Sequence, residues 1–274
     1  MTRIESRRRL ILLITLILSP LSVAGETGDE GWTDLVALDA ELVALGEPQT
    51  TDGVPQFGSE AIQHRASAVE SIQARLARID PSAWSVAGKV DFLLVWARAN
   101  GMEFEHRVIR PWQRDPIFYL NLVRRTPYAE LPSDDVGDSL STVPLILQQA
   151  RVNLTEPNGE LADLSLFHLE NFDGVGQGQP YRDNPPAGSI GWYIDLCHRL
   201  EKEQPIHTPT CKEALQAVQG FRDWLQERRP GMPASAGIGT ENLEWYFRRV
   251  RLLPYGVDEI VLLGEREFHR YRTA

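Results

Sequence analysis

The sequence predicts an all-α protein, built as an irregular array of helices. Three observations lead to this prediction. Apolar residues recur at intervals of three and four along most of the chain, capping residues and prolines mark where these stretches begin and end, and alternating runs of β-branched residues are essentially missing. A hydrophobic content of 42% over 274 residues is enough to form a real core.

The first 24 residues have the pattern of a secretory signal peptide. Four arginines and a glutamate precede an apolar stretch from Leu10 to Ala24, which Pro20 interrupts, and Ser22 and Ala24 are small residues placed as a cleavage site requires. A retained membrane anchor is the alternative, but it needs about 20 uninterrupted apolar residues. We therefore expect cleavage after Ala24 and an exported chain, periplasmic or extracellular, with no membrane contact after cleavage. Its formal charge changes from −10 to −13.

The mature chain divides into a segment over 25–58, with a polar lead-in, a first helix and a loop, and a helical domain over 59–274. Periodicity and capping residues predict the helices 32–45, 59–80, 82–109, one starting at Asp115-Pro116, 132–150, 210–225 with a capping box at its start, 240–251 capped by Thr240, and 256–271. Ser59 is the expected cap of the second helix. The stretches 46–58, 174–192 and 231–239 are predicted loops.

The last predicted helix keeps its apolar stripe almost to the end of the sequence. Val257, Val261, Phe268 and Tyr271 continue the stripe to within three residues of Ala274, whereas a helix usually ends with glycine, asparagine or a polar tail. We expect this face to be exposed, which makes the chain sticky or oligomeric.

The acidic balance of the chain bears on its partners. There are 38 acidic and 28 basic residues, and binding to nucleic acid or to an anionic membrane surface requires clustered lysine and arginine. The composition therefore argues against both kinds of partner.

The spacing of potential metal ligands gives little indication of a metal site in this sequence. The His-Glu-x-x-His pattern of zinc peptidases is absent, and the nearest local pattern, Glu103 with His106, lacks the second copy that a carboxylate-bridged site needs. A solvated or ion-paired helix face is the simpler interpretation of these two residues. We expect no cofactor in this chain.

The two cysteines leave three alternatives open. Cys197, His198, His207 and Cys211 lie within 15 residues, which is compatible with a zinc clip, with free thiols or with a disulfide. An oxidising exported compartment favours a Cys197–Cys211 disulfide, which would stabilise the fold by about 3 kcal/mol through loop closure.

Two glycine-containing motifs resemble catalytic or cofactor loops without matching them. Gly188-Ser189-Ile190-Gly191 has the wrong spacing for a nucleophile elbow, and the run from Gly174 to Gly178 lacks the third glycine of a dinucleotide loop. No strand is predicted before either motif. Both are better explained as flexible loops.

The densest unusual cluster runs from Arg110 to Tyr119. Its two prolines predict an elbow between helices, and a purely structural corner is one interpretation. The other is a ligand-contacting loop, in which Arg110 and Arg114 pair with a carboxylate while Trp112 and Tyr119 offer apolar surfaces with polar groups. These four residues are the candidate substrate contacts.

At this cluster the sequence resembles the bacterial domain of unknown function 885 family. The resemblance rests on motifs in a shared order over about residues 60–272: 92–94, 103–107, 110–112, 114–116 and Tyr119, then 143–154, 237–239, Tyr246, 252–255 and 265–267. Members of that family are exported helical proteins, roughly twice this length, that look like zinc-dependent carboxypeptidases with the metal helix in their C-terminal half.

The resemblance implies an N-terminal half without its own metal site. On that interpretation the chain is a non-catalytic domain, zinc belongs only to full-length relatives, and a separate C-terminal half is a potential partner. The alternative function is a peptide-binding module derived from that family. A second alternative is a hydrolase with an unrecognised site around Glu103, Glu105 and His106.

Overall fold

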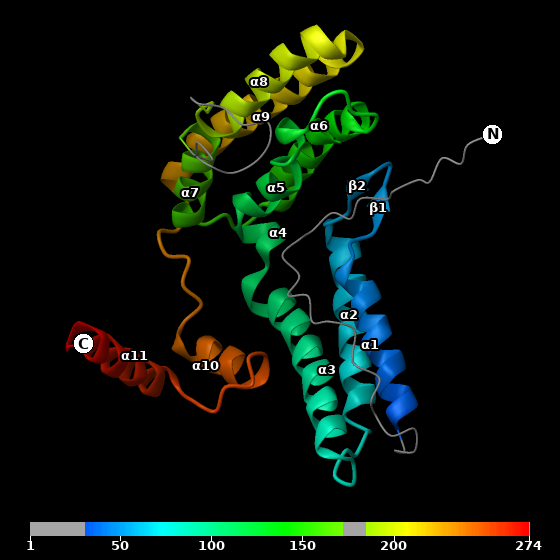
Figure 1. The fold of residues 1–274 in the computed structure, drawn as a ribbon, viewed down its shortest axis with the longest axis vertical. Coiled ribbons are helices and arrows are strands. Elements are labelled where there is room, and N and C mark those ends of the chain that lie inside the picture. The colour runs from blue at the N-terminus through cyan, green and yellow to red at the C-terminus, as the bar shows by residue number, and fades with distance from the viewer. Residues whose placement is uncertain (1–30, 172–184, 274) are drawn as a thin grey trace.

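The computed structural model describes residues 31–171 and 185–273, and over these residues the protein is an irregular array of helices (Figure 1). The all-α prediction is confirmed for this part of the chain. The first half contains α1 (Trp32–Gly46), α2 (Ser59–Leu76), α3 (Val86–Phe104), α4 (Pro111–Arg114), α5 (Pro116–Val123) and α6 (Val136–Asn153). The second half contains α7 (Gly159–Glu170), α8 (Gly188–Glu203), α9 (Thr208–Arg228), α10 (Thr240–Arg249) and α11 (Val257–Thr273).

Short single-turn elements connect several of these helices. They are the π-helix η1 (Glu105–Ile109) and the 3₁₀ turns η2 (Thr126–Tyr128), η3 (Pro205–His207) and η4 (Arg229–Gly231). A small antiparallel hairpin, β1 (Thr50–Thr51) with β2 (Val54–Pro55), lies where the sequence predicts only a loop. Asp52 and Gly53 form its turn, and both have positive φ, as a two-residue hairpin turn requires.

The buried side chains form two separate hydrophobic cores. The lower core in Figure 1 joins α1, α2 and α3, with Leu38, Ile72 and Val95 among its buried members. The upper core joins α4 to α9 and includes Leu147, Leu196 and Phe221. Because α1 shares a core with α2 and α3, no break in packing separates the segment before residue 59 from the helical domain after it.

Several helix starts differ from their predicted positions. The predicted capping box at Thr210 is wrong, because α9 already begins at Thr208 after the η3 turn, and Pro209 occupies its first turn. Neither Ser59 nor Thr240 caps its helix; each is the first helical residue, and glycine precedes it. The third helix begins at Val86, where the Ser85 hydroxyl accepts a hydrogen bond from the Gly88 amide. The Asp115 cap is confirmed: its carboxylate accepts from the Ile117 amide at 2.9 Å.

One helix is absent from the prediction, and another begins earlier than expected. The sequence contains no signal strong enough to predict α7 (Gly159–Glu170), although the side-chain oxygen of Asn158 caps this helix. The predicted 174–192 loop is wrong at its end, because α8 begins at Gly188, so Ser189 lies on a helix. The rest of that loop, Gly174 to Gly178 included, and the signal peptide lie outside the described residues.

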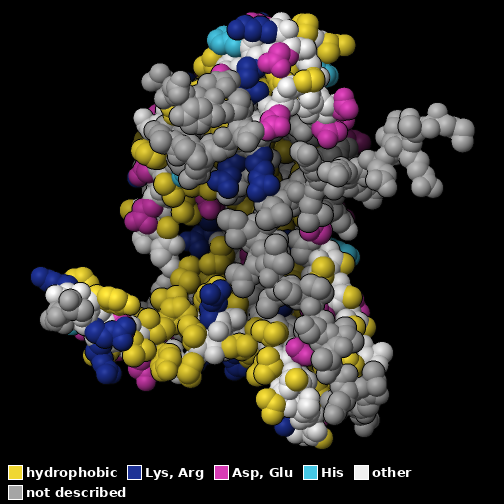
Figure 2. Space-filling view, in the orientation of Figure 1, with side chains coloured by type: hydrophobic (Ala, Val, Ile, Leu, Met, Phe, Trp, Pro, Cys, Tyr) yellow, Lys and Arg dark blue, Asp and Glu magenta, His cyan; other side chains and the backbone are white. Residues whose placement is uncertain are grey.

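The C-terminal helix α11 extends away from the rest of the molecule. α10 packs on α3, where the Trp245 ring stacks on Phe104 with centroids 5.5 Å apart, and α11 continues outward from α10 (Figure 1). Hydrophobic side chains gather over this α10–α11 region in the space-filling view (Figure 2). None of the described helices combines the length and hydrophobicity needed to cross a membrane.

Candidate functional site

The corner between α3 and α4 positions a group of arginines. After Phe104 the helix widens into the π turn η1, which ends when the Arg110 amide donates to the Glu105 carbonyl at 2.8 Å. Arg110 then adopts a left-handed conformation with φ of 45°, and Pro111 begins α4. A residue before proline is disfavoured in the right-handed helical region, so the sequence itself forces this break. Arg107, Arg110 and Arg114 therefore follow one another around a bend instead of along a straight helix.

An extended strap, residues 232–239, passes the other side of this corner. The Asn158 side-chain amide donates to the carbonyls of Pro233 (3.3 Å) and Ser235, and the Gly159 amide donates to the Pro233 carbonyl at 2.8 Å. The same Asn158 side chain caps α7, and its backbone amide donates to the Arg114 carbonyl at 3.1 Å. One buried asparagine thus connects α4, α7 and the strap.

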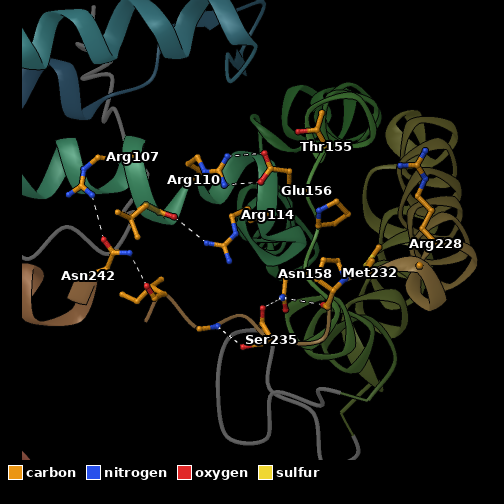
Figure 3. Close-up of a pocket in the computed structure, with 16 residues that line it drawn as sticks. Arg107, Arg110, Arg114, Thr155, Glu156, Asn158, Arg228, Met232, Ser235 and Asn242 are labelled. Atoms are coloured by element: carbon orange, nitrogen blue, oxygen red, sulfur yellow. Dashed lines mark hydrogen bonds and ion pairs between the residues drawn. The ribbon is translucent and has the colours of Figure 1, made fainter. Parts of the chain in front are cut away.

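Between the corner, the α6–α7 turn and the strap lies a pocket of about 810 Å³. Figure 3 shows that its lining side chains come from elements far apart in the sequence. Its charged lining residues, among those the structure describes, are four arginines and one glutamate: Arg107, Arg110, Arg114, Arg228 and Glu156. In a chain of net charge −10, this is a local excess of positive charge.

Two of the four arginines are already paired with carboxylates. The Arg110 guanidinium donates two hydrogen bonds to Glu156, at 2.9 and 2.8 Å, and Arg107 donates from Nε to Glu103 at 2.5 Å. The hydrogen bonds from Arg110, together with the charges of Arg110 and Arg114, hold the pKa of Glu156 below its usual value. Arg107 also stacks on the Trp245 ring at 5.0 Å.

The other two arginines have no ion pair with a carboxylate among the described residues. Arg114 donates one hydrogen bond, to the Val108 carbonyl at 3.1 Å, and its guanidinium projects into the open centre of the pocket (Figure 3). Arg228 lies at the α9 edge, exposed, with its guanidinium 5.0 Å from the Trp224 ring centroid. The charge of Arg114 acts on Glu156, but its guanidinium makes no ion pair with a described carboxylate, which suits it to receive an anionic group.

The structure separates the four residues expected to contact a ligand into two pairs. Arg110 and Arg114 line the pocket, whereas Trp112 and Tyr119 are buried in the upper core, 2% and 0% exposed. The Tyr119 hydroxyl donates to the Trp112 carbonyl at 2.9 Å, and burial raises the Tyr119 pKa. The expectation of ligand contact is therefore wrong for these two aromatic residues, which act as the structural corner that holds the arginines.

The Glu103–His106 pattern belongs to an ion-paired helix face. Glu103 is paired with Arg107, and the His106 ring donates from Nδ1 to the Met102 carbonyl at 2.7 Å while packing against Trp112. Over residues 31–171 and 185–273, no group of three or more histidine, cysteine, aspartate or glutamate side chains is arranged to hold a metal ion.

Cys197 on α8 and Cys211 on α9 form a disulfide. Both cysteines are buried, and the bond links two helices of the upper core. Since a zinc clip requires thiolates, the bonded sulfur atoms are not available to bind zinc with His198 and His207.

Sequence reasoning misses the pocket residues outside the corner. Arg228 ends α9, Asn158 precedes α7, and Ser235 and Asn242 belong to the strap and α10. The sequence does contain one signal, the basic pair Arg228-Arg229 directly before Pro230 and Gly231, which is typical of a helix end. Nothing in the sequence connects that helix end with residue 110.

Comparisons with models of known protein families, with curated proteins and with solved structures give no match to this chain.

Proposed function

We propose that this chain is an exported, non-catalytic helical domain that binds a peptide-like ligand through a carboxylate group. The proposal follows the resemblance to the N-terminal half of a zinc-peptidase-like family. The observation that carries it is Arg114, a partly buried guanidinium that projects into a pocket without a carboxylate partner among the described residues. Arginine binds a carboxylate through two parallel hydrogen bonds, which fixes the orientation of the ligand as well as its charge.

The rest of the pocket supports a peptide-like ligand over a simple ion. The volume of about 810 Å³ is in the range of pockets for small organic molecules and short peptides. Strap residues Met232, Pro233, Ser235, Gly237 and Ile238 line one side.

The proposal places no zinc site on this chain. The cysteines are bonded to each other, and no cluster of three or more suitable side chains occurs among the residues placed by the structure. We therefore assign no chemical step to a metal here. Within the proposal, a zinc-bearing C-terminal half is a separate partner, and the arginine pocket forms one wall of the cleft that such a partner would complete.

The test compares a short peptide with a free C-terminal carboxylate and the same peptide with an amidated C-terminus. Calorimetric titration is expected to show binding of the free acid and a loss of affinity of about tenfold or more for the amide, since one charged hydrogen-bonded pair is worth about 1.5–3 kcal/mol. Arg114→Gln is expected to bind both peptides with the weaker affinity. Arg78→Gln, an exposed arginine just after α2, is the matched control and leaves binding unchanged.

Two results would contradict the proposal. One is equal affinity for the acid and the amide, which would mean that no carboxylate is recognised. The other is unchanged binding in Arg114→Gln, which would place the ligand elsewhere. If acetate or inorganic phosphate at low concentration displaced the peptide, the pocket would be a general anion site and not a peptide site.

A further inference from the structure

The helix α11 exposes large apolar side chains to solvent. Val261, Phe268 and Tyr271 are 54%, 59% and 74% exposed. Isolated exposed apolar residues are ordinary, but a contiguous set along one helix marks an interaction surface.

The apolar positions on α11 have the spacing of a coiled-coil seam. Val257, Val261, Gly264, Phe268 and Tyr271 are separated by four, three, four and three residues, which keeps them on one side of the helix. Gly264 lies at the centre of this seam, and a Cβ placed there would meet no atom within 4 Å. Glycine costs an exposed helix about 1 kcal/mol relative to alanine, and it is useful where the backbone of a second helix approaches closely.

The charges on α11 show what kind of helix can pair with it. Its first turn carries Asp258 and Glu259, and its last turn carries Arg270 and Arg272. A helix with acidic residues at one end and basic residues at the other is complementary to an antiparallel copy of itself. Antiparallel pairing also places the positive end of one helix dipole beside the negative end of the other.

We propose that α11 is a dimerisation helix, which pairs with α11 of a second copy of this chain in antiparallel orientation about a two-fold axis at Gly264. In this register Val261 of one copy faces Phe268 of the other, and Val257 faces Tyr271. Asp258 comes beside Arg272 of the second copy. The two-fold axis repeats each of these contacts, as an isologous interface requires.

The size of the surface and one local repulsion set the strength of this dimer. A helix of 17 residues is about 25 Å long, so the paired surface is smaller than a standard interface, and we expect a dissociation constant in the micromolar range. Glu265 follows Gly264 and comes beside Glu265 of the second copy at the axis. Glu265→Gln should therefore tighten the dimer, by about fivefold, because it removes a like-charge contact.

Sedimentation velocity of the chain from residue 25 onward, over a wide range of protein concentration, tests the dimer. The expected result is a concentration-dependent monomer–dimer equilibrium that Phe268→Glu abolishes. Val152→Glu is the matched control, since Val152 is 71% exposed on α6, away from α11, and its replacement should leave the dimer intact. Circular dichroism confirms that each variant is folded.

A charge exchange tests the antiparallel register itself. Asp258→Arg and Arg272→Asp are each expected to weaken the dimer by about tenfold, because two symmetry-related pairs become repulsive, and the double variant is expected to restore it. A chain that stays monomeric at every concentration overturns the proposal. So does a dimer that Phe268→Glu leaves unchanged, or an α11 that stays solvent-accessible until a separate peptidase half is added.

Discussion

Arg110 and Glu156, which are 46 residues apart in sequence, form a bidentate ion pair at the pocket. Each terminal nitrogen of the guanidinium donates to one of the two carboxylate oxygens. Glu156 comes from the α6–α7 turn and Arg110 from the bend before α4, so the pair joins two walls of the pocket. The carboxylate holds the position on Arg110 that a ligand carboxylate would otherwise take.

Replacing this internal carboxylate should strengthen ligand binding. Glu156→Gln removes the acidic lining residue and releases Arg110. The affinity for a carboxylate peptide is therefore expected to rise about fivefold, because an exposed ion pair contributes about 0.2–1 kcal/mol. The side chain of Glu156 is 53% exposed, so the free energy of unfolding should change little. Calorimetric titration with the free-acid peptide gives the affinity. Glu47→Gln, remote from the pocket, should leave it unchanged, and weaker binding in Glu156→Gln would mean that Glu156 contacts the ligand directly.

The Asp115 cap gives a pH-dependent prediction. Burial raises the pKa of Asp115 above its ordinary value, despite the amide hydrogen bonds that favour the charged form. Asp115 therefore ionises less readily in the folded protein than in the unfolded chain. Its contribution to the free energy of unfolding is largest at acid pH and is lost as the pH rises through the raised pKa. The substitution Asp115→Asn keeps the capping oxygen and removes the charge.

We therefore expect Asp115→Asn to gain stability relative to the wild type as the pH rises from acid to neutral. Asp115→Ala loses the cap and should cost about 1 kcal/mol. Urea unfolding at a series of pH values measures both differences. A constant difference between the Asn variant and the wild type across the series would show that Asp115 titrates alike in both states.

The disulfide is expected to contribute substantially to the stability of the upper core. Joining Cys197 to Cys211 closes a loop of 14 residues in sequence separation, and loops of this size are worth about 3 kcal/mol in the chain-entropy model. The double variant Cys197→Ala, Cys211→Ala should lose about that amount in urea unfolding. Reduction of the wild type should give a similar loss, whereas an unchanged midpoint under reductant would mean that the two cysteines are not joined in solution.

Two glycines with positive φ should respond very differently to alanine. At Gly188, φ is 62° and a Cβ would lie 2.3 Å from the Leu169 carbonyl oxygen, a backbone atom that cannot move aside easily. At Gly239, φ is 80° but a Cβ would meet nothing within 4 Å. Gly239→Ala is expected to cost about 1–2 kcal/mol from backbone strain alone, and Gly188→Ala clearly more. Equal losses in thermal unfolding would contradict the close approach of α7 to the start of α8.

Helices with strong local signals are predictable from the sequence, and others are not. The Asp115-Pro116 start is identifiable because both the cap and the proline act within one turn. α7 escapes prediction because its sequence, GELADLSLFHLE, begins with glycine and its stripe is short, so only packing between α5 and α8 shows which face is buried. The capping box at Thr210 is a false signal, because Pro209 is equally suited to the first turn of a helix that begins earlier.

The candidate site is predictable only in part, for a similar reason. Arg110 and Arg114 stand out because two prolines mark an elbow, and the elbow is a local property of the chain. Trp112 and Tyr119 lie in the same elbow, and sequence alone does not show that their side chains face the core. Asn158 and Arg228 reach the pocket only through tertiary packing, which no local pattern encodes.

The π turn from Glu105 to Ile109 makes the whole pocket dependent on chain length. A π turn is in effect a helix with one residue too many, and that additional residue changes the direction of every side chain after it. Deleting a single residue within 105–109 would remove the widened turn and would rotate α4, with Arg110 and Arg114, by about 100° relative to α3. Substitutions adjust single contacts of the pocket, whereas an insertion or deletion here would displace the pocket arginines together with Trp112, which is buried in the upper core.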